Sequence, residues 1–257
     1  GFRLAVEGQE LLDGTGRDLT IDDEIADGLL AGEVTLAGRV ARNREGLTAE
    51  NFRIANGQVQ LLADGTYSSS QADFAFNLDL SDLALLSPQA SGALAVVGTA
   101  KGAEGVIALN LDASVPSGQL AGRALRDGAL RFAGQYAEES LTGAISGTGA
   151  LDGFSTTLAA DLRVTPAAQA LDNIDFQAAG TRISGGLTRT VVSGLVDGGL
   201  SVVSPDVSVA AALALLDASG AVNAEITLAP NGAAQSAGIR GDVRGLVVND
   251  ISVGAAD

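Results

Sequence analysis

The chain has 257 residues, with 31 acidic and 15 basic residues and a formal net charge of −16. A chain this acidic repels phosphate backbones, so we expect no nucleic-acid partner. The absence of Cys and His from the sequence excludes disulfides, thiolate nucleophiles, Ser-His-Asp triads and the usual zinc sites.

A seven-residue pattern, glycine to glycine with two apolar residues between, occurs at residues 32–38, 92–98 and 128–134, and more loosely at 57–65. Side chains alternate between the two faces of a strand, so the glycines and the apolar residues share one face. The pattern therefore predicts short strands with one apolar face and a glycine at each end.

Period-two alternation continues through residues 74–81, 107–115, 154–165, 174–179 and 222–228, which is typical of sheets with one dry and one wet face. Asn-Gly and Asp-Gly pairs predict hairpin turns between the strands. These pairs are Asn56-Gly57, Asp64-Gly65, Asp127-Gly128, Asp152-Gly153, Asp197-Gly198 and Asn231-Gly232. We expect roughly 20 strands at about ten to twelve residues per strand and turn.

Helical candidates are few. Residues 25–30 and 81–86 could each form one helical turn. The Ala-rich stretch 209–218 could be a short helix or a buried strand, and we favour a strand because Val207 and Val209 lead into it and Gly220 follows. The fold class we predict is all-β, with many strands forming an elongated, curled sheet (a half-pipe or β-taco) that has an apolar inner face. A β-helix and a β-sandwich are the alternatives.

No proline-rich or low-complexity linker divides the chain, so we expect residues 1–257 to form one continuous β region. The sequence has no Met, and its longest apolar run, residues 209–216, is far shorter than the roughly 20 residues of a membrane span. We therefore expect a fragment of a longer protein, with any membrane anchor outside these residues.

The acidic clusters Asp22-Asp23-Glu24 and Glu138-Glu139 are interpreted as solvated loops. Residues 14–19 match part of a calcium-binding nonapeptide, but such sites need tandem copies and this one stands alone. No phosphate-binding loop is present, and Lys101 is the only lysine. We expect no enzyme activity, no cofactor and no metal.

Several segments in succession resemble the repetitive β region of the TamB (translocation and assembly module) and AsmA-like family of bacterial envelope proteins. They are residues 47–55 (LTAENFRIA), 59–66 (VQLLADGT), 72–88 (ADFAFNLDLSDLALLSP) and 91–99 (SGALAVVGT). The resemblance is sharpest over residues 47–98 and 128–152.

The resemblance implies a non-enzymatic conduit in the periplasm, anchored in the inner membrane by a segment not present here. Such a conduit carries phospholipid acyl chains along an apolar groove between the two membranes and assists outer-membrane protein assembly and secretion. It also implies a partner, a BamA-type (TamA-like) outer-membrane barrel, engaged by regions outside this segment.

The apolar positions of the predicted strands are the candidates for the groove lining. They are Val34, Leu36, Phe74, Phe76, Leu78, Leu80, Leu94, Val96, Leu109, Leu111, Leu130, Phe132, Phe154, Leu158, Leu162, Ile174, Phe176, Ile226 and Leu228. Alternation alone does not separate an open groove from a closed core. The alternative function is therefore a surface or secreted β-helical adhesin or autotransporter passenger. A third hypothesis is a carbohydrate-active or calcium-dependent enzyme on a β scaffold.

Overall fold

The computed structural model describes residues 8–17, 24–42, 46–68, 71–208, 211, 217–248 and 251–253. It is nearly all β, with 78% strand and 4% helix. The chain divides into two compact units. Unit 1 comprises Gly1–Pro116 and Gln135–Glu138, and unit 2 comprises Ser117–Gly134 and Glu139–Asp257.

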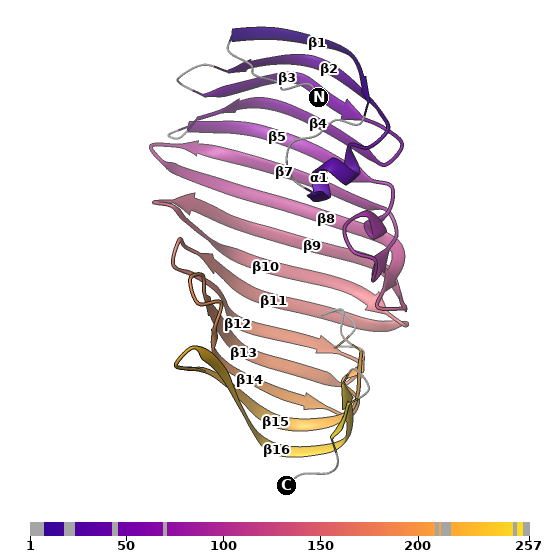
Figure 1. Ribbon diagram of the computed structural model, residues 1–257, viewed down its shortest axis with the longest axis vertical. Helices are drawn as coiled ribbons and strands as arrows, with labels where there is room; N and C mark the ends of the chain where they lie inside the picture. The colour runs from indigo at the N-terminus through magenta and orange to yellow at the C-terminus, as the bar shows by residue number, and fades with distance from the viewer. Residues whose placement is uncertain are drawn as a thin grey trace. The chain divides into compact units, whose positions relative to one another are not determined.

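Unit 1 is an antiparallel sheet in which each strand pairs with its neighbours in the chain, apart from the short β6 (Figure 1). Its strands are β1 (Gly8–Arg17), β2 (Glu33–Arg42), β3 (Leu47–Ala55), β4 (Val59–Tyr67), β5 (Gln71–Leu80), β6 (Ala90–Ser91), β7 (Leu94–Ala103) and the first part of β8 (Val106–Leu120). Two short helices, α1 (Glu24–Leu29) and η1 (Leu83–Leu85), lie in the connections before β2 and after β5.

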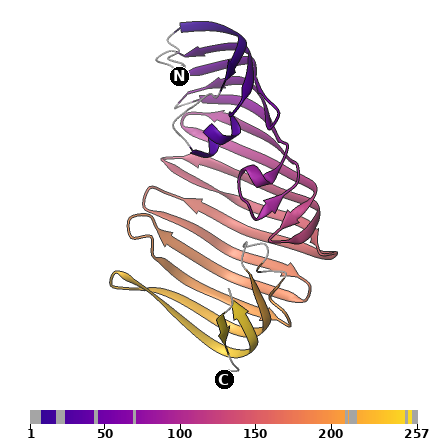
Figure 2. The same ribbon diagram turned by 45° about the vertical axis from the view of Figure 1, so that its right-hand side comes forward.

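Unit 2 is also an antiparallel sheet of strands paired in chain order. Its strands are most of β9 (Arg123–Ala137), then β10 (Ser140–Leu151), β11 (Phe154–Val164), β12 (Ala168–Ala178), β13 (Thr181–Thr190), β14 (Val196–Ser204), β15 (Ala218–Asn231), β16 (Ala234–Val248) and β17 (Ile251–Val253). The strands curve along their length, as Figure 2 shows.

The predicted fold class is confirmed: the protein is all-β, with open, curled antiparallel sheets. Within the described residues β1 pairs only with β2, and β17 covers only the last residues of β16, so neither edge closes on another strand. A β-helix requires parallel pairing between coils, and the antiparallel register of consecutive strands rules it out for the described strands.

Short turns with positive φ connect many strands. Both turn residues have positive φ at Glu104-Gly105, Ala121-Gly122, Glu138-Glu139, Asp152-Gly153 and Ala179-Gly180. This backbone matches the right-handed twist of the flanking strands, which explains why such turns recur here. The exposed Glu138-Glu139 pair is thus a turn, as expected, whereas Asp22 and Asp23 lie outside the described residues.

Three of the six predicted Asn-Gly and Asp-Gly turns are wrong. Asp64-Gly65, Asp127-Gly128 and Asp197-Gly198 lie inside β4, β9 and β14. Gly65 and Gly198 have φ of 124° and 138°, and Asp127 has φ of 48°. The pairs are irregular points within continuous strands, because positive φ suits an internal kink as well as a turn. Strands are consequently longer than predicted, reaching 15 residues, and the described residues form 17 rather than about 20.

The predicted glycine boundaries are also corrected. Gly38 lies inside β2, Gly98 inside β7, and both Gly128 and Gly134 inside β9. A Cβ at Gly38 would overlap the backbone of Asn51 and Phe52 at 2.5–2.8 Å, where the pairing of β2 with β3 shifts register. The second glycine of the pattern therefore permits close strand contact within a strand rather than marking its end.

The helical turns predicted at residues 25–30 and 81–86 are confirmed as α1 and η1. The strand favoured over residues 209–218 is wrong at Ala211, and within this range only Ala218, the first residue of β15, is described as a strand. Ala211 is helical, and its backbone N–H donates to the carbonyl oxygen of Val207 at 2.9 Å. Pro205 and Asp206 precede this turn, and Asp206 accepts from the Ser208 N–H, so the local capping chemistry outweighs the apolar run.

Candidate functional site

The centre of one face of unit 1 consists of three adjoining rows of residues. Each row runs across the strands among β2, β3, β4, β5, β7 and β8, and its residues are paired from one strand to the next. Every residue in these rows is apolar or glycine. The first row is Leu36, Ile54, Leu61, Leu78, Val96 and Ala113; the second is Phe52, Ala63, Phe76, Gly98 and Leu111; the third is Val40, Ala49, Gly65, Phe74, Ala100 and Leu109. We call them the central rows of unit 1.

The large side chains of these central rows are partly exposed. Each Leu, Ile, Val and Phe residue among them is neither buried nor fully exposed. A sheet face that packs in a closed core would bury such residues. This face is therefore an apolar surface that is partly exposed to solvent.

Gly98 and Phe76 pack directly against each other within the central rows. A Cβ at Gly98 would overlap the ring of Phe76 and would lie 2.8 Å from Leu111 Cδ2. Because Gly98 has no side chain, the ring of Phe76 can lie over it from the neighbouring strand, as aromatic rings lie over glycines in other sheets. Phe132 is placed in the same way, with its ring 2.6 Å from the Cβ position of Gly134 and 2.7 Å from that of Gly143.

One end of the unit 1 face is closed. Val59 and Leu80, which pair there, are 7% and 2% exposed. The adjacent turn is tied to the end of α1, because Asn56 Nδ2 donates to the carbonyl oxygen of Leu29, the last residue of that helix, at 2.8 Å. Asp82 holds the η1 connection by accepting from the backbone N–H of Ala84 at 3.0 Å and of Gly92 at 2.8 Å.

Unit 2 carries a similar apolar face across β10 to β16, on which Phe176 and Val202 are buried and Leu171 and Ile239 are exposed. Its rows are again apolar or glycine throughout. The first is Gly147, Leu158, Phe176, Ile183, Val202, Ala224 and Gly241; the second is Ile174, Gly185, Leu200, Ile226 and Ile239; the third is Gly143, Leu162, Leu171, Leu187, Gly198, Leu228 and Ala237. We call them the central rows of unit 2.

A row of hydroxyl groups closes one end of the unit 2 face. Thr156, Thr181 and Ser204 are buried there. Thr181 and Ser204 hydrogen-bond to each other, and Thr181 Oγ1 also donates to the carbonyl oxygen of Asp206 at 3.2 Å. Asp206 accepts from the N–H of Ser208 at 3.0 Å and of Gly220 at 3.4 Å, as Asp82 does from Ala84 and Gly92 in unit 1. We call each of these arrangements, one carboxylate bound to two backbone N–H groups, a bracket.

Both bracket carboxylates have a lowered pKa. Hydrogen bonds from the backbone N–H groups of Ala84 and Gly92 lower the pKa of Asp82. The N–H of Ser208 is the main cause for Asp206, with smaller contributions from the Ser208 hydroxyl, Gly220 and Arg123. Donors stabilise the charged form, so both brackets are set in the ionised state at neutral pH.

The opposite face of each unit is polar and holds cross-strand ion pairs. They include Arg39–Glu50 at 2.8 Å, Lys101–Asp73 at 3.4 Å, Arg163–Asp172 at 3.5 Å and Arg182–Asp175 at 3.4 Å. The separation of charge to one face follows from the period-two alternation, since each partner lies one residue from an apolar-face position.

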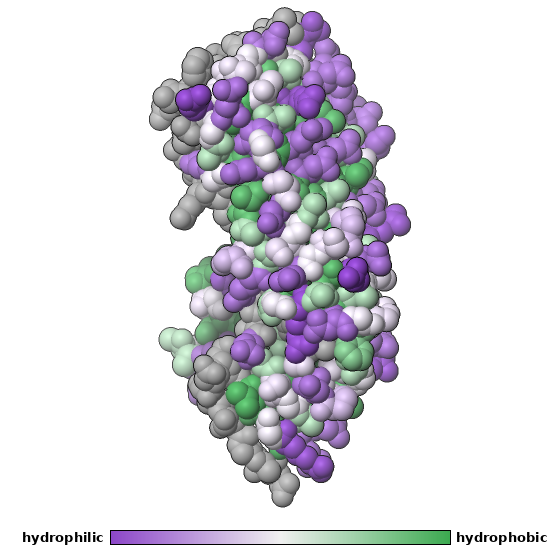
Figure 3. Space-filling view, turned by 90° about the vertical axis from the view of Figure 1, so that its right-hand side faces the viewer, coloured by the Kyte–Doolittle hydropathy of each residue, from purple (hydrophilic) through white to green (hydrophobic). Residues whose placement is uncertain are grey.

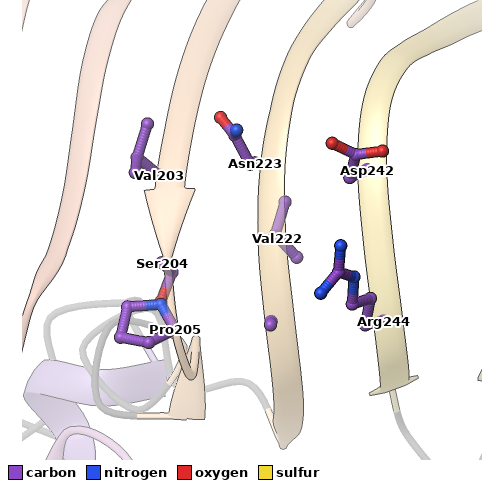
Figure 4. Close-up of a pocket in the computed structure, with 8 residues that line it drawn as sticks. Val203, Ser204, Pro205, Val222, Asn223, Asp242 and Arg244 are labelled. Atoms are coloured by element: carbon purple, nitrogen blue, oxygen red, sulfur yellow. The ribbon is translucent and has the colours of Figure 1, made fainter.

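A shallow hollow of about 410 Å³ lies on the polar face of unit 2, at β14 to β16. Figure 4 shows Asn223 and Asp242 projecting from neighbouring strands, with the guanidinium of Arg244 reaching towards Val222. The described part of the chain contains no cluster of metal-ligating residues. The hollow is open and small, and apolar residues such as Val203 and Val222 line it beside Asp242 and Arg244. The extended apolar faces therefore remain the stronger candidate.

Most candidate lining residues lie in the central rows. Leu36, Phe74, Phe76, Leu78, Val96, Leu109 and Leu111 lie in those of unit 1, and Leu158, Leu162, Ile174, Phe176, Ile226 and Leu228 in those of unit 2. Leu130 joins this face of unit 2, because its Cδ1 lies 3.3 Å from the Cβ position of Gly147.

The remaining candidates do not line the open centre. Val34 and Leu80 are 0% and 2% exposed, Phe132 is buried over its glycines, and Leu94 pairs with Leu80 at the closed end. Phe154 is half exposed at the start of β11, beyond the row of Thr156. Their role in lining a groove stays a prediction.

Several residues of the central rows were missed from the sequence. They include Ile54, Leu61, Ile183, Leu187 and Leu200. Glycines interrupt the alternation around Ile183 and Leu187, and register shifts interrupt it in β3. Reading the alternation through glycine would have found them.

Comparison with protein-family models, with curated proteins and with solved structures finds no match for this chain. None of the described helices has the length and hydrophobicity needed to cross a membrane.

Proposed function

We propose that the protein is a non-enzymatic lipid conduit whose apolar faces bind the acyl chains of phospholipids. One observation carries the proposal: in each unit, three adjoining rows on one sheet face contain no polar side chain and leave large apolar groups partly exposed. An acyl chain is the ligand whose chemistry such a surface matches along its whole length.

The dimensions support this ligand. At about 4.8 Å between strands, the first and third central rows run for roughly 24 Å across six strands of unit 1 and roughly 29 Å across seven strands of unit 2. The second row of each unit spans five strands, or roughly 19 Å. One leaflet of a bilayer has a hydrocarbon depth of about 15 Å. Each row is therefore long enough to hold an extended acyl chain.

The energetics also support it. Moving a CH₂ group from water into an apolar environment is worth about 0.8 kcal/mol. A bound acyl chain would gain this over many groups while also covering the exposed Leu, Ile and Phe side chains of the rows. The absence of polar side chains from the rows leaves no fixed contact along them, so a chain could slide.

The resemblance to the TamB and AsmA-like family points to the same role. In this proposal the protein works in the periplasm, as part of a bridge between the two membranes of a bacterial envelope. A BamA-type barrel in the outer membrane is the protein partner, engaged through regions outside this segment.

Arginine substitutions on the apolar face test the proposal. Leu78→Arg in unit 1 and Leu158→Arg in unit 2 place a charge in the path of the acyl chain, and we expect each to remove most bound lipid. The matched controls are Asn77→Arg and Thr157→Arg, which place the same side chain at the neighbouring position on the polar face and should bind lipid normally.

Lipid is measured by native mass spectrometry and by crosslinking to a photoactivatable phosphatidylcholine, with circular dichroism to verify that each variant keeps its β structure. If the unsubstituted protein neither carries lipid nor takes it up from vesicles, the proposal is wrong. Equal binding by the two Leu→Arg variants and their controls would also contradict it.

A further inference from the structure

The ends of the strands decide which headgroup a bound lipid can carry. This inference rests on the proposed function, in which the acyl chain occupies the apolar face. The headgroup must then leave the central rows, which offer it no polar side chain, and it reaches polar groups at the strand ends and in the loops that connect the strands.

Those loops carry charge of one sign. The described connections between strands contain acidic residues and not a single Arg or Lys. The acidic residues are Glu24, Asp27, Asp82, Glu104, Glu138, Glu139, Asp152, Asp206 and Asp217. Figure 3, which faces the strand ends on the right of Figure 1, shows hydrophilic side chains spread over these ends.

The cations that the structure describes all lie on strands, and most point away from the apolar face. Arg39, Lys101, Arg163 and Arg182 are in ion pairs on the polar face. Arg123, at the first position of β9, is bound to Asp152 at 2.7 Å.

Arg42 is the cation placed most favourably for a headgroup, because it ends β2 on the apolar-face side. Arg189 also lies on the apolar-face side, near the end of β13, where its Nη1 donates to Gln169 Oε1 at 3.2 Å. Two exposed guanidinium groups are thus set against the acidic loops and a net charge of −16. The potential at the strand ends is therefore negative, and it repels an anionic headgroup within a Debye length, about 10 Å at 0.1 M salt.

We infer that the apolar faces accept lipids with neutral or zwitterionic headgroups and disfavour lipids whose headgroups carry net negative charge. Phosphatidylcholine and phosphatidylethanolamine belong to the accepted class, and phosphatidylglycerol and cardiolipin to the disfavoured class. The apolar rows bind the acyl chains of both lipid classes, and the charge of the loops distinguishes their headgroups.

The test compares uptake of fluorescent phosphatidylcholine and fluorescent phosphatidylglycerol, which have the same acyl chains, by the 257-residue protein. At about 10 mM NaCl, where the Debye length is about 30 Å, we expect phosphatidylcholine to bind roughly tenfold more tightly. At about 1 M NaCl, where that length is about 3 Å, the two affinities should agree within about twofold.

A pair of double variants locates the effect. Glu104→Lys with Glu139→Lys reverses two charges in the loops, and Asp79→Lys with Glu225→Lys reverses two on the polar face. Each pair changes the net charge by the same amount, from −16 to −12. We expect the loop pair to abolish most of the discrimination at low salt and the polar-face pair to keep most of it.

Equal uptake of the two lipids at low salt, or tighter binding of phosphatidylglycerol, would overturn this inference while leaving the proposed function intact. Loss of discrimination in both double variants alike would overturn the assignment to the loops. Failure to take up either lipid would overturn the proposed function and this inference with it.

Discussion

The apolar faces of the two units are built from the same alternation of side chains, but they differ in how many glycines their central rows contain. The central rows of unit 1 contain two glycines, Gly65 and Gly98, whereas those of unit 2 contain five. In unit 1 the ring of Phe76 fills the space over Gly98. In unit 2 the Cβ position of Gly147 meets Leu130 Cδ1 at 3.3 Å and nothing nearer. At most other glycines of these rows, Gly65, Gly185, Gly198 and Gly241, φ is positive and a Cβ would overlap the backbone of the partner strand.

The two units agree where backbone groups must be bound. Each has an aspartate after a strand, Asp82 or Asp206, that holds a helical turn and also binds the glycine of a Ser-Gly-Ala tripeptide further along the chain. The comparison teaches that the connections after β5 and β14 are specified by hydrogen bonding, whereas the central rows of each face tolerate different side-chain volumes.

The largest expected difference between the units concerns Gly98, over which the ring of Phe76 lies. Gly98→Ala should destabilise the protein by about 1–3 kcal/mol, the usual cost of overpacking, because its Cβ overlaps the Phe76 ring and crowds Leu111. Gly147→Ala should change stability by no more than about 0.5 kcal/mol, since the one close atom, Leu130 Cδ1 at 3.3 Å, is the end of a side chain that can shift slightly. Urea unfolding measures the change in stability of both variants, and equal changes would show that glycine has the same role in the central rows of the two units.

The brackets should loosen in acid, in both units alike. A lowered pKa means that each carboxylate contributes stability above its ordinary pKa of 3.8 and loses it as pH falls through the lowered value. Hydrogen-exchange protection of the Ala84, Gly92 and Ser208 amides should therefore be constant from neutral pH to about 5 and decline below about 4. Asp82→Asn and Asp206→Asn should remove this dependence, each at its own bracket; a decline that persists in both variants would assign it to other carboxylates.

The smallest effects are expected from the polar faces. Lys101→Gln breaks the pair with Asp73 in unit 1, and Arg182→Gln breaks the pair with Asp175 in unit 2. Both cations are more than 60% exposed, so each substitution should cost less than about 1 kcal/mol and less still in high salt. Thermal unfolding at two salt concentrations measures this, and a large, salt-independent loss at either site would mean that the face is packed rather than solvated.

Much of the fold and part of the candidate site could be predicted because alternation is a local property. The positions of Leu78 and Leu158 on an apolar face follow from their neighbours in the chain. The turns at Asn56-Gly57, Asp152-Gly153 and Asn231-Gly232 were correct for the same reason. The internal Asp-Gly pairs were not, because positive φ is required both in a turn and at a kink within a strand, and only the partner strand distinguishes the two.

The sequence by itself determined the all-β class, the apolar and polar faces, the two short helical turns of unit 1 and the negative charge. These depend on the period of side chains along one strand and on composition. Only the tertiary structure decided the antiparallel register, the rows that align Leu36 with Ile54 and Leu61, and the packing of Phe76 over Gly98. Those features are contacts between strands, and their energies depend on which residues meet across the sheet rather than on any one segment.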